Sequence, residues 1–262
     1  MRDLLNLDRF PLERTDSPHC VQLVERCKAD LAAHGMFTLE GFVNAPAIAR
    51  AVSELDPLIN GAGYRHARRH NIYFKEEIPG LAPDHPALKK LETVNYTLCA
   101  DQLSGTIVDR IYEWAPLVDF LARVMDKPRL FLMYDPLARL NVLAYRPSAA
   151  LNWHFDRSQF TTTLLIRAAE SGGEFEYRSA LRSDAEPNYD GVARLLRGED
   201  PEMSVLPLAA GSLNVFAGRH TAHRVSPVGG GVRRIVAVFS YYEEPGFSFS
   251  SSERLGFYGR SR

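Results

Sequence analysis

The sequence reads Asn152-Trp153-His154-Phe155-Asp156 between two apolar, alternating segments, a position typical of a β-strand or its end. Side chains two residues apart on a strand point to the same face. An imidazole nitrogen of His154 and a carboxylate oxygen of Asp156 can therefore meet at one point. A third ligand from a distant segment would complete a face of three around a divalent metal. Because an isolated His-x-Asp is more often a surface pair, this hypothesis depends on residues further along the chain.

Two histidines compete for the third position, His220 and His223. His220 lies in a predicted turn at 218–221, where hydrogen bonding to the backbone is the simpler role. His223 begins the apolar alternation 223–228, at the edge of a predicted strand, as His154 does. We therefore predict that His223 is the third ligand.

Arg233 and Arg234 follow a glycine-rich turn and begin the apolar run 235–242. Neighbours on a strand face opposite ways, so one arginine can enter the core while the other stays in water. Both could also lie at an exposed strand end. A buried guanidinium needs a partner because an unpaired buried charge is very costly. A dicarboxylate would supply one through a two-pronged hydrogen bond.

Together, His154-x-Asp156, His223 and Arg234 resemble the signature of the Fe(II)- and 2-oxoglutarate-dependent dioxygenases. The similarity covers most of residues 65–260 and is closest to the subgroup of free-amino-acid hydroxylases and lysine-type carbon halogenases. It implies a double-stranded β-helix, or jelly roll, with helices packed outside. It also implies Fe(II) bound by the two histidines and the aspartate. Arg234, rather than Arg233, would bind the distal carboxylate of 2-oxoglutarate, and O2 would be the cosubstrate.

Asp156 is a departure from the halogenases of this subgroup, which carry Gly or Ala there and so leave a coordination position for chloride. The resemblance therefore implies hydroxylation, of a free amino acid or an amino-acid derivative. A protein or peptide hydroxylase and a catalytically silent jelly-roll binding protein are the alternatives. The complete set of His154, Asp156, His223 and Arg234 argues against the silent protein.

Other polar residues near these motifs have two interpretations each. Asn141 and Tyr145 share one face of a predicted strand, where they could line the cosubstrate site or satisfy the backbone. Arg157 could reach a substrate carboxylate or pair with Glu174 or Glu176, and we favour the ion pair.

The segment 64–74 carries three arginines, two histidines and two tyrosines next to glycines. One interpretation is a solvated loop with a following strand. The other is a lid over the site, in which Arg65, Arg68 and Arg69 meet a carboxylate of the substrate.

Apolar periodicity divides the chain into a helix-rich part, 1–129, and a part of short strands, 130–262. Helices are predicted over 18–34, 45–58, 88–102 and 108–125. Strands are predicted over 36–39, 140–145, 161–166, 172–177, 211–216 and 234–242, with an insertion loop over 183–203. The prediction is an α+β fold with a mainly β jelly-roll core, on which the N-terminal part packs as one integrated domain.

The composition excludes several classes of protein. The chain has 262 residues, 45% of them hydrophobic, and a net charge of −1, which argues against a nucleic-acid partner. No segment is as long and apolar as a membrane span or a signal peptide, so we expect a cytoplasmic protein. Cys20, Cys27 and Cys99 lack zinc spacing and are predicted to be core thiols. We expect a small-molecule substrate, and the sequence does not indicate an oligomeric state.

Overall fold

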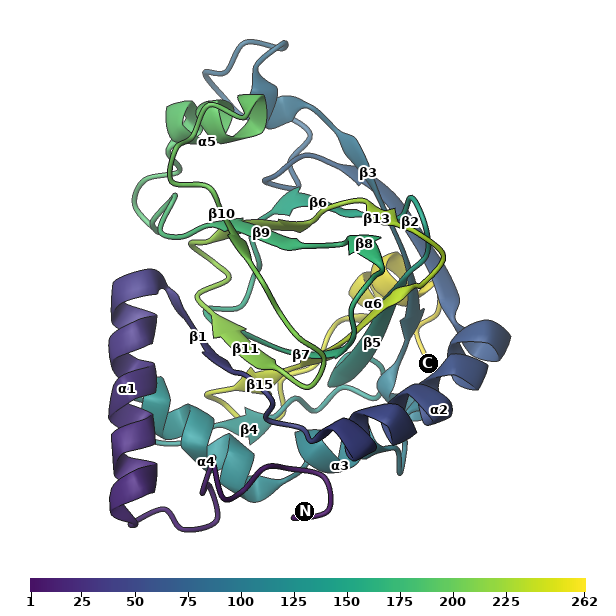
Figure 1. Cartoon of the computed structure of the whole chain (residues 1–262). Coiled ribbons are helices and arrows are strands. Elements are labelled where there is room, and N and C mark those ends of the chain that lie inside the picture. The colour runs from purple at the N-terminus through teal and green to yellow at the C-terminus, as the bar shows by residue number, and fades with distance from the viewer.

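Two antiparallel β-sheets lie at the centre of the computed structural model, which describes residues 1–262 (Figure 1). The larger sheet has seven strands in the order β1 (Met36–Leu39), β11 (Leu213–Phe216), β7 (Thr161–Arg167), β14 (Arg234–Phe239), β5 (Leu140–Tyr145), β3 (Leu91–Leu98) and β2 (Tyr64–His70). The smaller has four, in the order β10 (Ser204–Leu206), β9 (Phe175–Arg178), β12 (Ala222–Val225) and β6 (Leu151–His154). This is the predicted jelly roll.

Two separate two-stranded sheets complete the β structure. They are β13 (Val228–Gly229) with β8 (Ser171–Gly172), and β15 (Tyr241–Tyr242) with β4 (Phe131–Leu132). Single 3₁₀ turns occur at Pro86–Leu88 and Ala100–Gln102.

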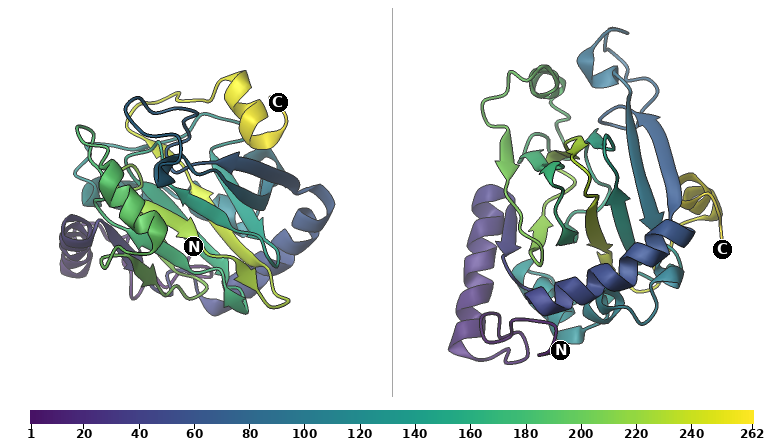
Figure 2. Two further views of the ribbon diagram at one scale, coloured as in Figure 1. Left: turned by 90° about the horizontal axis from the view of Figure 1, so that it is seen from above. Right: turned by 45° about the vertical axis from the view of Figure 1, so that its right-hand side comes forward.

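Helices cover the outer face of the larger sheet (Figure 2). They are α1 (Pro18–His34), α2 (Ala45–Ala62), α3 (Ile107–Tyr112) and α4 (Ala115–Val124). The alternation of β14 shows how the two faces differ: Ile235 and Ala237 pack in the cluster shared with these helices, whereas Val236 packs in a separate cluster with Tyr145. The first face makes the main core, and the second face lines the space between the sheets.

The first helix illustrates how local sequence specifies an element. Ser17 caps it by accepting a hydrogen bond from the Cys20 amide, and Pro18 occupies the first turn. Gly35 ends it in the left-handed conformation at φ 72°, which glycine adopts without strain. The helix places Cys20 and Cys27 in the core as free thiols, as predicted.

The predicted helix over 88–102 is wrong, because residues 91–98 form β3. Leu91, Val94 and Leu98 have the spacing of a helical face, which misled the prediction. The intervening Thr93 and Thr97 are β-branched and pack well on a pleated sheet. Pairing with β2 and β5 therefore decides the local structure.

Other element boundaries also differ from prediction: α2 runs on to Ala62, and the strand predicted over 172–177 is divided between β8 and β9. The helix over 108–125 is two helices, because Pro116 starts α4 after a break at 113–114. The polar insertion 183–203 contains α5 (Tyr189–Arg197), capped by Asn188. The final strand is interrupted at Ser240, which separates β14 from β15.

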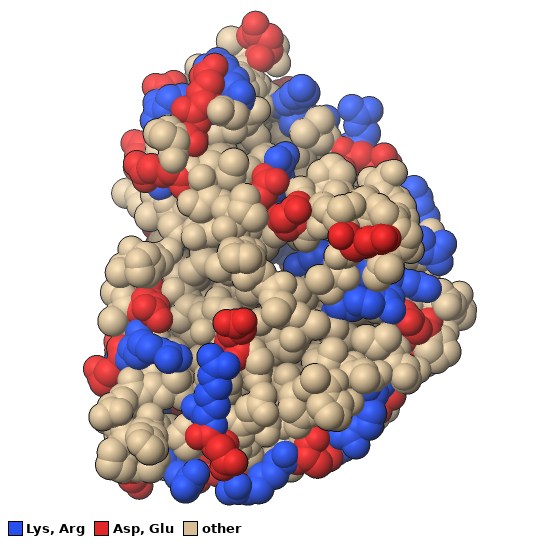
Figure 3. All heavy atoms as spheres, viewed as in Figure 1, with Lys and Arg blue, Asp and Glu red and all other residues tan.

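The N-terminal part contributes more than helices, since β1, β2 and β3 belong to the larger sheet. The segment 64–74, expected to be either a solvated loop with a following strand or a lid, forms the edge strand β2 over its residues 64–70. Basic and acidic side chains are interspersed over the face in Figure 3. None of the helices is both long and apolar enough to cross a membrane.

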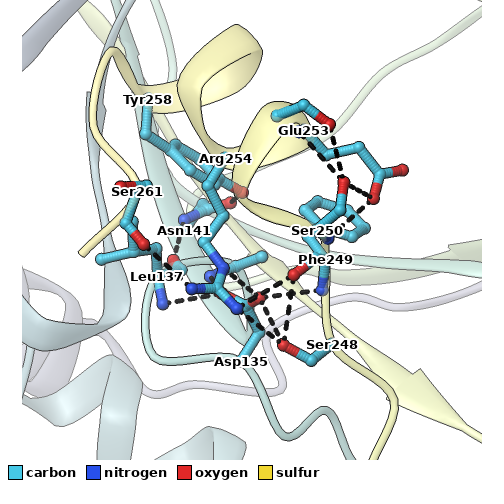
Figure 4. A network of polar contacts seen from close by, with 12 residues as sticks. Asp135, Leu137, Asn141, Ser248, Phe249, Ser250, Glu253, Arg254, Tyr258 and Ser261 are labelled. Carbon is cyan, nitrogen blue, oxygen red and sulfur yellow. Dashed lines mark hydrogen bonds and ion pairs between the residues drawn. The ribbon is translucent and has the colours of Figure 1, made fainter.

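The C-terminal helix α6 (Ser251–Tyr258) is tied to the loop before β5 by the buried carboxylate of Asp135 (Figure 4). One oxygen of Asp135 accepts hydrogen bonds from the backbone of residues 137 and 138. The other accepts from Ser248, from the Phe249 amide and from Arg254, whose Nε lies 3.0 Å away. The Tyr258 hydroxyl also donates to Asn141.

Candidate metal centre

His154 and His223 meet because their strands are neighbours in the smaller sheet. β6 and β12 pair with His223 directly opposite His154, and their ring centroids are 4.1 Å apart. Phe216 packs against the His223 ring at 4.7 Å, and Phe175 does so at 5.6 Å. Tight packing on a rigid sheet gives both imidazoles defined orientations.

The hydrogen bonds of the two imidazoles determine which nitrogen is free. His154 Nδ1 lies 2.9 Å from the Asn152 carbonyl, and His223 Nδ1 lies 3.0 Å from the Thr221 carbonyl. A carbonyl oxygen only accepts, so each Nδ1 carries the hydrogen and each Nε2 keeps its lone pair. This is the orientation expected of metal-ligating histidines.

Asp156 faces both free lone pairs. Its carboxylate oxygens lie 3.4 Å from His154 Nε2 and 3.5 Å from His223 Nε2, and the three ligand atoms lie within 4.8 Å of one another. The Thr161 hydroxyl donates to the carboxylate at 2.5 Å. A Cβ on Gly218 would lie 2.4 Å from an Asp156 oxygen, so the loop can approach the aspartate only with glycine there.

The surroundings of these side chains favour the protonation states in which they can bind a metal ion. Burial alone would raise the pKa of Asp156, but His223, His154 and the Thr161 hydroxyl together hold it well below its usual range. Burial, and then His154, lower the pKa of His223 to about 4. At neutral pH the site therefore has one carboxylate and at least one neutral imidazole available to a cation.

Arg234 and Tyr145 form a second polar group inside the barrel, as cross-strand partners on β14 and β5. Arg234 is 4% exposed and Tyr145 is fully buried. Neither Arg234 Nη1 nor the Tyr145 hydroxyl has a hydrogen-bond partner. Burial lowers the pKa of Arg234 and raises that of Tyr145 to about 12. Buried polar atoms are rarely left unpaired in proteins, so this pair fits a carboxylate ligand.

Arg233 points the other way, as strand alternation predicts. Its Nε lies 3.7 Å from Asp56 on α2. Asp56 also accepts two hydrogen bonds from Arg167, at 2.9 Å each. Arg233 therefore joins a helix–sheet ion-pair group and is directed away from the barrel interior.

Three other candidates from the sequence have partners within the protein. Asn141 donates to the carbonyls of residues 137 and 140 and accepts from Tyr258, so its amide is committed within the protein. The Arg157 side chain is 69% exposed and pairs with Glu253 at 2.5 Å. His220 lies 3.2 Å from Asp184 and outside the group of three.

The expected partners of Arg157 have others of their own. Glu174 accepts a hydrogen bond from Ser226, and Glu176 pairs with Arg224 at 2.6 Å. The prediction of a pair with Glu174 or Glu176 is therefore wrong. The actual partner, Glu253, lies on α6, and nothing in the sequence indicates that this residue comes close to Arg157.

The arginines of the segment 64–74 divide by strand alternation. Arg68 lies opposite Thr93 in the β2–β3 pair, on the face that carries His70. Its guanidinium lies 5.2 Å from the ring centroid of Phe74, and that ring is 6.1 Å from the His154 ring.

Arg65 and Arg69 occupy the opposite face of β2. Arg69 donates to the Lys90 carbonyl. The sequence could not separate Arg68 from Arg65 and Arg69, because the register of β2 on β3 decides which face each side chain occupies. Phe74, which carries the contact with Arg68, has no distinguishing signal in the sequence.

Residues 21–253 match the family described as Halogenase D. The chain belongs to this family. Among solved structures, the chain is similar to the epimerase SnoN in complex with Fe³⁺, alpha ketoglutarate and nogalamycin RO, at a TM-score of 0.59 and 16% identity over 84% of each chain. No curated protein matches the sequence.

Two further solved structures share the fold. HygX from Streptomyces hygroscopicus, with nickel and 2-oxoglutarate bound, gives a TM-score of 0.52 at 15% identity over 82% of this chain and 85% of HygX. A Pseudomonas putida prolyl-4-hydroxylase gives 0.50 at 15% identity, over 82% of this chain and 97% of that one. With the family match, these similarities identify the chain as one of the 2-oxoglutarate-dependent oxygenases, with a jelly-roll fold.

Proposed function

We propose that this member of the halogenase D family is an Fe(II)- and 2-oxoglutarate-dependent oxygenase that hydroxylates a small molecule, a free amino acid or an amino-acid derivative. The observation that carries the proposal is the meeting of two free Nε2 lone pairs with the Asp156 carboxylate, within 4.8 Å. Two imidazoles and one carboxylate are the ligand set of non-haem Fe(II) oxygenases.

His154, Asp156 and His223 would hold the metal, and Arg234 with Tyr145 would hold the far carboxylate of 2-oxoglutarate. When bound, Fe(II) and 2-oxoglutarate supply the activation of O2, coupled to decarboxylation of the 2-oxoglutarate to succinate. Arg234 contributes a fixed charge that is itself shielded from water, at 4% exposure, and such charges act strongly at low dielectric.

Asp156 supports hydroxylation over halogenation. Halogenases of the resembling subgroup have no side-chain ligand at this position, which leaves room for chloride. Here the carboxylate is present, and Thr161 and the close approach of Gly218 hold it in place. A chloride ion would have to compete with an oriented anionic ligand.

Arg68 supports a substrate that carries a carboxylate. No acidic side chain lies within ion-pair distance of it, whereas Arg157 and Arg233 are both paired. Its guanidinium lies over Phe74, beside the metal centre. An unpaired arginine held against an aromatic ring is suited to bind a substrate carboxylate through two hydrogen bonds.

The test is incubation of the Fe(II)-loaded protein with 2-oxoglutarate, O2 and a panel of free amino acids, followed by mass spectrometry. We expect one amino acid or derivative to gain one oxygen atom, with matching succinate, and no chlorinated product when chloride is present. Incorporation only into peptides would redirect the proposal to a peptide hydroxylase. Chlorination would overturn the role given to Asp156.

Variants connect the activity to the site. His154→Ala and His223→Ala should abolish binding of Fe(II) and product formation. His220→Ala is the matched control, because His220 pairs with Asp184 outside the metal centre. Loss of the metal in His220→Ala alone would contradict the assignment of ligands.

A further inference from the structure

A continuous line of buried hydrogen bonds connects the ligand His154 to strand β2. His154 Nδ1 lies 2.9 Å from the Asn152 carbonyl, and the Asn152 amide nitrogen lies 3.0 Å from Thr93 Oγ1. Thr93 Oγ1 lies 2.7 Å from His70 Nε2, and His70 Nδ1 lies 3.0 Å from the Asn71 carbonyl. All five residues are buried, so water does not compete for these bonds.

The carbonyl oxygens and the Asn152 N–H fix the donor and the acceptor in three of these four bonds. The Asn152 N–H must donate to Thr93 Oγ1, so the Thr93 hydroxyl can give its own hydrogen to His70 Nε2. His70 Nε2 is then an acceptor, and Nδ1 carries the hydrogen that it donates to the Asn71 carbonyl. For a neutral His70 the line therefore fixes one tautomer, and it depends on the Thr93 oxygen as the acceptor for the Asn152 N–H.

The hydrogen bond from Asn152 to Thr93 takes the place of a strand-pairing bond on the open edge of β6. β6, which carries His154, is the edge strand of the smaller sheet and pairs only with β12. The backbone N–H of Asn152 would need a partner on the open side, because buried amides are rarely unpaired. Thr93 supplies it, and the Asn152 side chain adds a bond of 3.3 Å to the His70 carbonyl.

The far end of the line is His70, which contacts the same aromatic ring, Phe74, that Arg68 contacts. The His70 ring stacks on Phe74 with centroids 4.3 Å apart and an angle of 17°. It also meets the His154 ring edge-on at 6.3 Å. Arg68 lies over the same Phe74 ring. His70 and Phe74 are therefore stacked side by side, and both rings meet the metal ligand His154 edge-on.

We propose that Thr93 and His70 are positioning residues of the metal centre: they hold Asn152 so that its carbonyl orients the His154 imidazole. The inference rests on the proposed function only in that a divalent metal binds at His154, Asp156 and His223. Partners that orient metal ligands typically change metal affinity by about 10- to 100-fold when removed. Because Thr93 acts through Asn152, we expect the lower end of this range.

Thr93→Val is the decisive variant, since it keeps the shape of the side chain and removes the hydroxyl. Thr97→Val is the matched control: Thr97 lies on the same strand and face, is equally buried at 3% exposure, and bonds only to Asn95. Thr93→Ser restores a hydroxyl. His70→Phe keeps a ring against Phe74 but removes the acceptor, and it replaces Thr93→Val if that variant does not fold.

The measurement is Co(II) titration of the metal-free protein, followed by calorimetry and by the visible ligand-field bands of the ion. We expect Thr93→Val to bind Co(II) about tenfold more weakly, with shifted bands, while Thr97→Val and Thr93→Ser match the wild type. Wild-type affinity and bands in Thr93→Val, or the same change in Thr97→Val, would overturn the inference. Absence of Co(II) binding by the wild type would instead overturn the proposed metal centre.

Discussion

Arg234 is a buried cation that has no anionic partner in the protein. Neighbouring Arg233 has the same side chain but lies just before β14, points the other way and faces Asp56. Burying an unpaired charge costs free energy that a binding partner must offset. At the scale of the residue, the buried guanidinium of Arg234 therefore favours the binding of a ligand that carries a carboxylate.

We predict that Arg234→Leu weakens 2-oxoglutarate binding by about 2–5 kcal/mol, at least about thirtyfold, because a buried charged pair loses one member. Arg233→Leu should have a much smaller effect. Calorimetry on the anaerobic, metal-loaded variants measures both. Arg234→Leu should also raise the free energy of unfolding of the protein without ligand, since the unpaired charge is removed. Equal effects of the two variants on binding would contradict the assignment.

At the scale of the element, the alternation of β2 separates arginines that are adjacent in sequence. Arg68 lies on the face of Thr93 and His70, and Arg65 lies on the other. We predict that Arg68→Ala raises the substrate KM about tenfold or more, because a charged hydrogen bond contributes about 1.5–3 kcal/mol. Arg65→Ala is the control and should leave KM unchanged, as should Arg69→Ala. Steady-state kinetics at saturating 2-oxoglutarate distinguishes them.

One outcome of the same experiment would contradict the prediction for Arg68→Ala. If Arg65→Ala raised KM and Arg68→Ala did not, the substrate would approach from the outer face of β2. The affinity for 2-oxoglutarate should be unchanged in all three variants, because Arg234 lies on a different strand, inside the barrel.

The C-terminal helix depends on one buried carboxylate. Asp135→Asn replaces an acceptor with a donor opposite Arg254 and the Phe249 amide, so we predict a loss of about 3–5 kcal/mol in stability. Asp101→Asn breaks the exposed pair with Arg260 in the same region and should cost at most about 1 kcal/mol. Hydrogen exchange of residues 247–260 and thermal unfolding measure the difference. Equal protection in both variants would show that α6 is held by other contacts.

At the scale of the whole molecule, buried neutral histidines link stability to pH. Burial is the main cause that lowers the pKa values of His70 and His223 to about 4. An unfolded histidine titrates near 6.5, so between pH 6.5 and 4 the unfolded chain binds protons that the folded chain does not. Stability must therefore fall as the pH falls through this window.

We predict that the metal-free protein loses up to about 3 kcal/mol per buried histidine between pH 6.5 and 4, and little between pH 8 and 7. Urea unfolding at a series of pH values measures this slope. His70→Gln should be less sensitive to pH than the wild type. A stability that rises as the pH is lowered would contradict the assignment of neutral histidines.

The residue types and their order along the chain determined much of the candidate site. Two histidines, an aspartate and an arginine at strand edges carry their chemistry in their side chains, and strand alternation already separated Arg233 from Arg234. Caps at Ser17 and Gly35 are likewise local, since they depend on hydrogen bonds within one turn.

Only the tertiary structure decided which partners meet across the sheets. The pairing of β6 with β12 brings His154 to His223, and the register of β2 on β3 places Arg68 on the face that carries His70. Residues 91–98 have the apolar spacing of a helix and become a strand because two neighbouring strands satisfy their backbone. Thr93 orients a metal ligand from far away in the sequence, and a threonine hydroxyl acquires such a role only when folding buries it beside an unpaired amide.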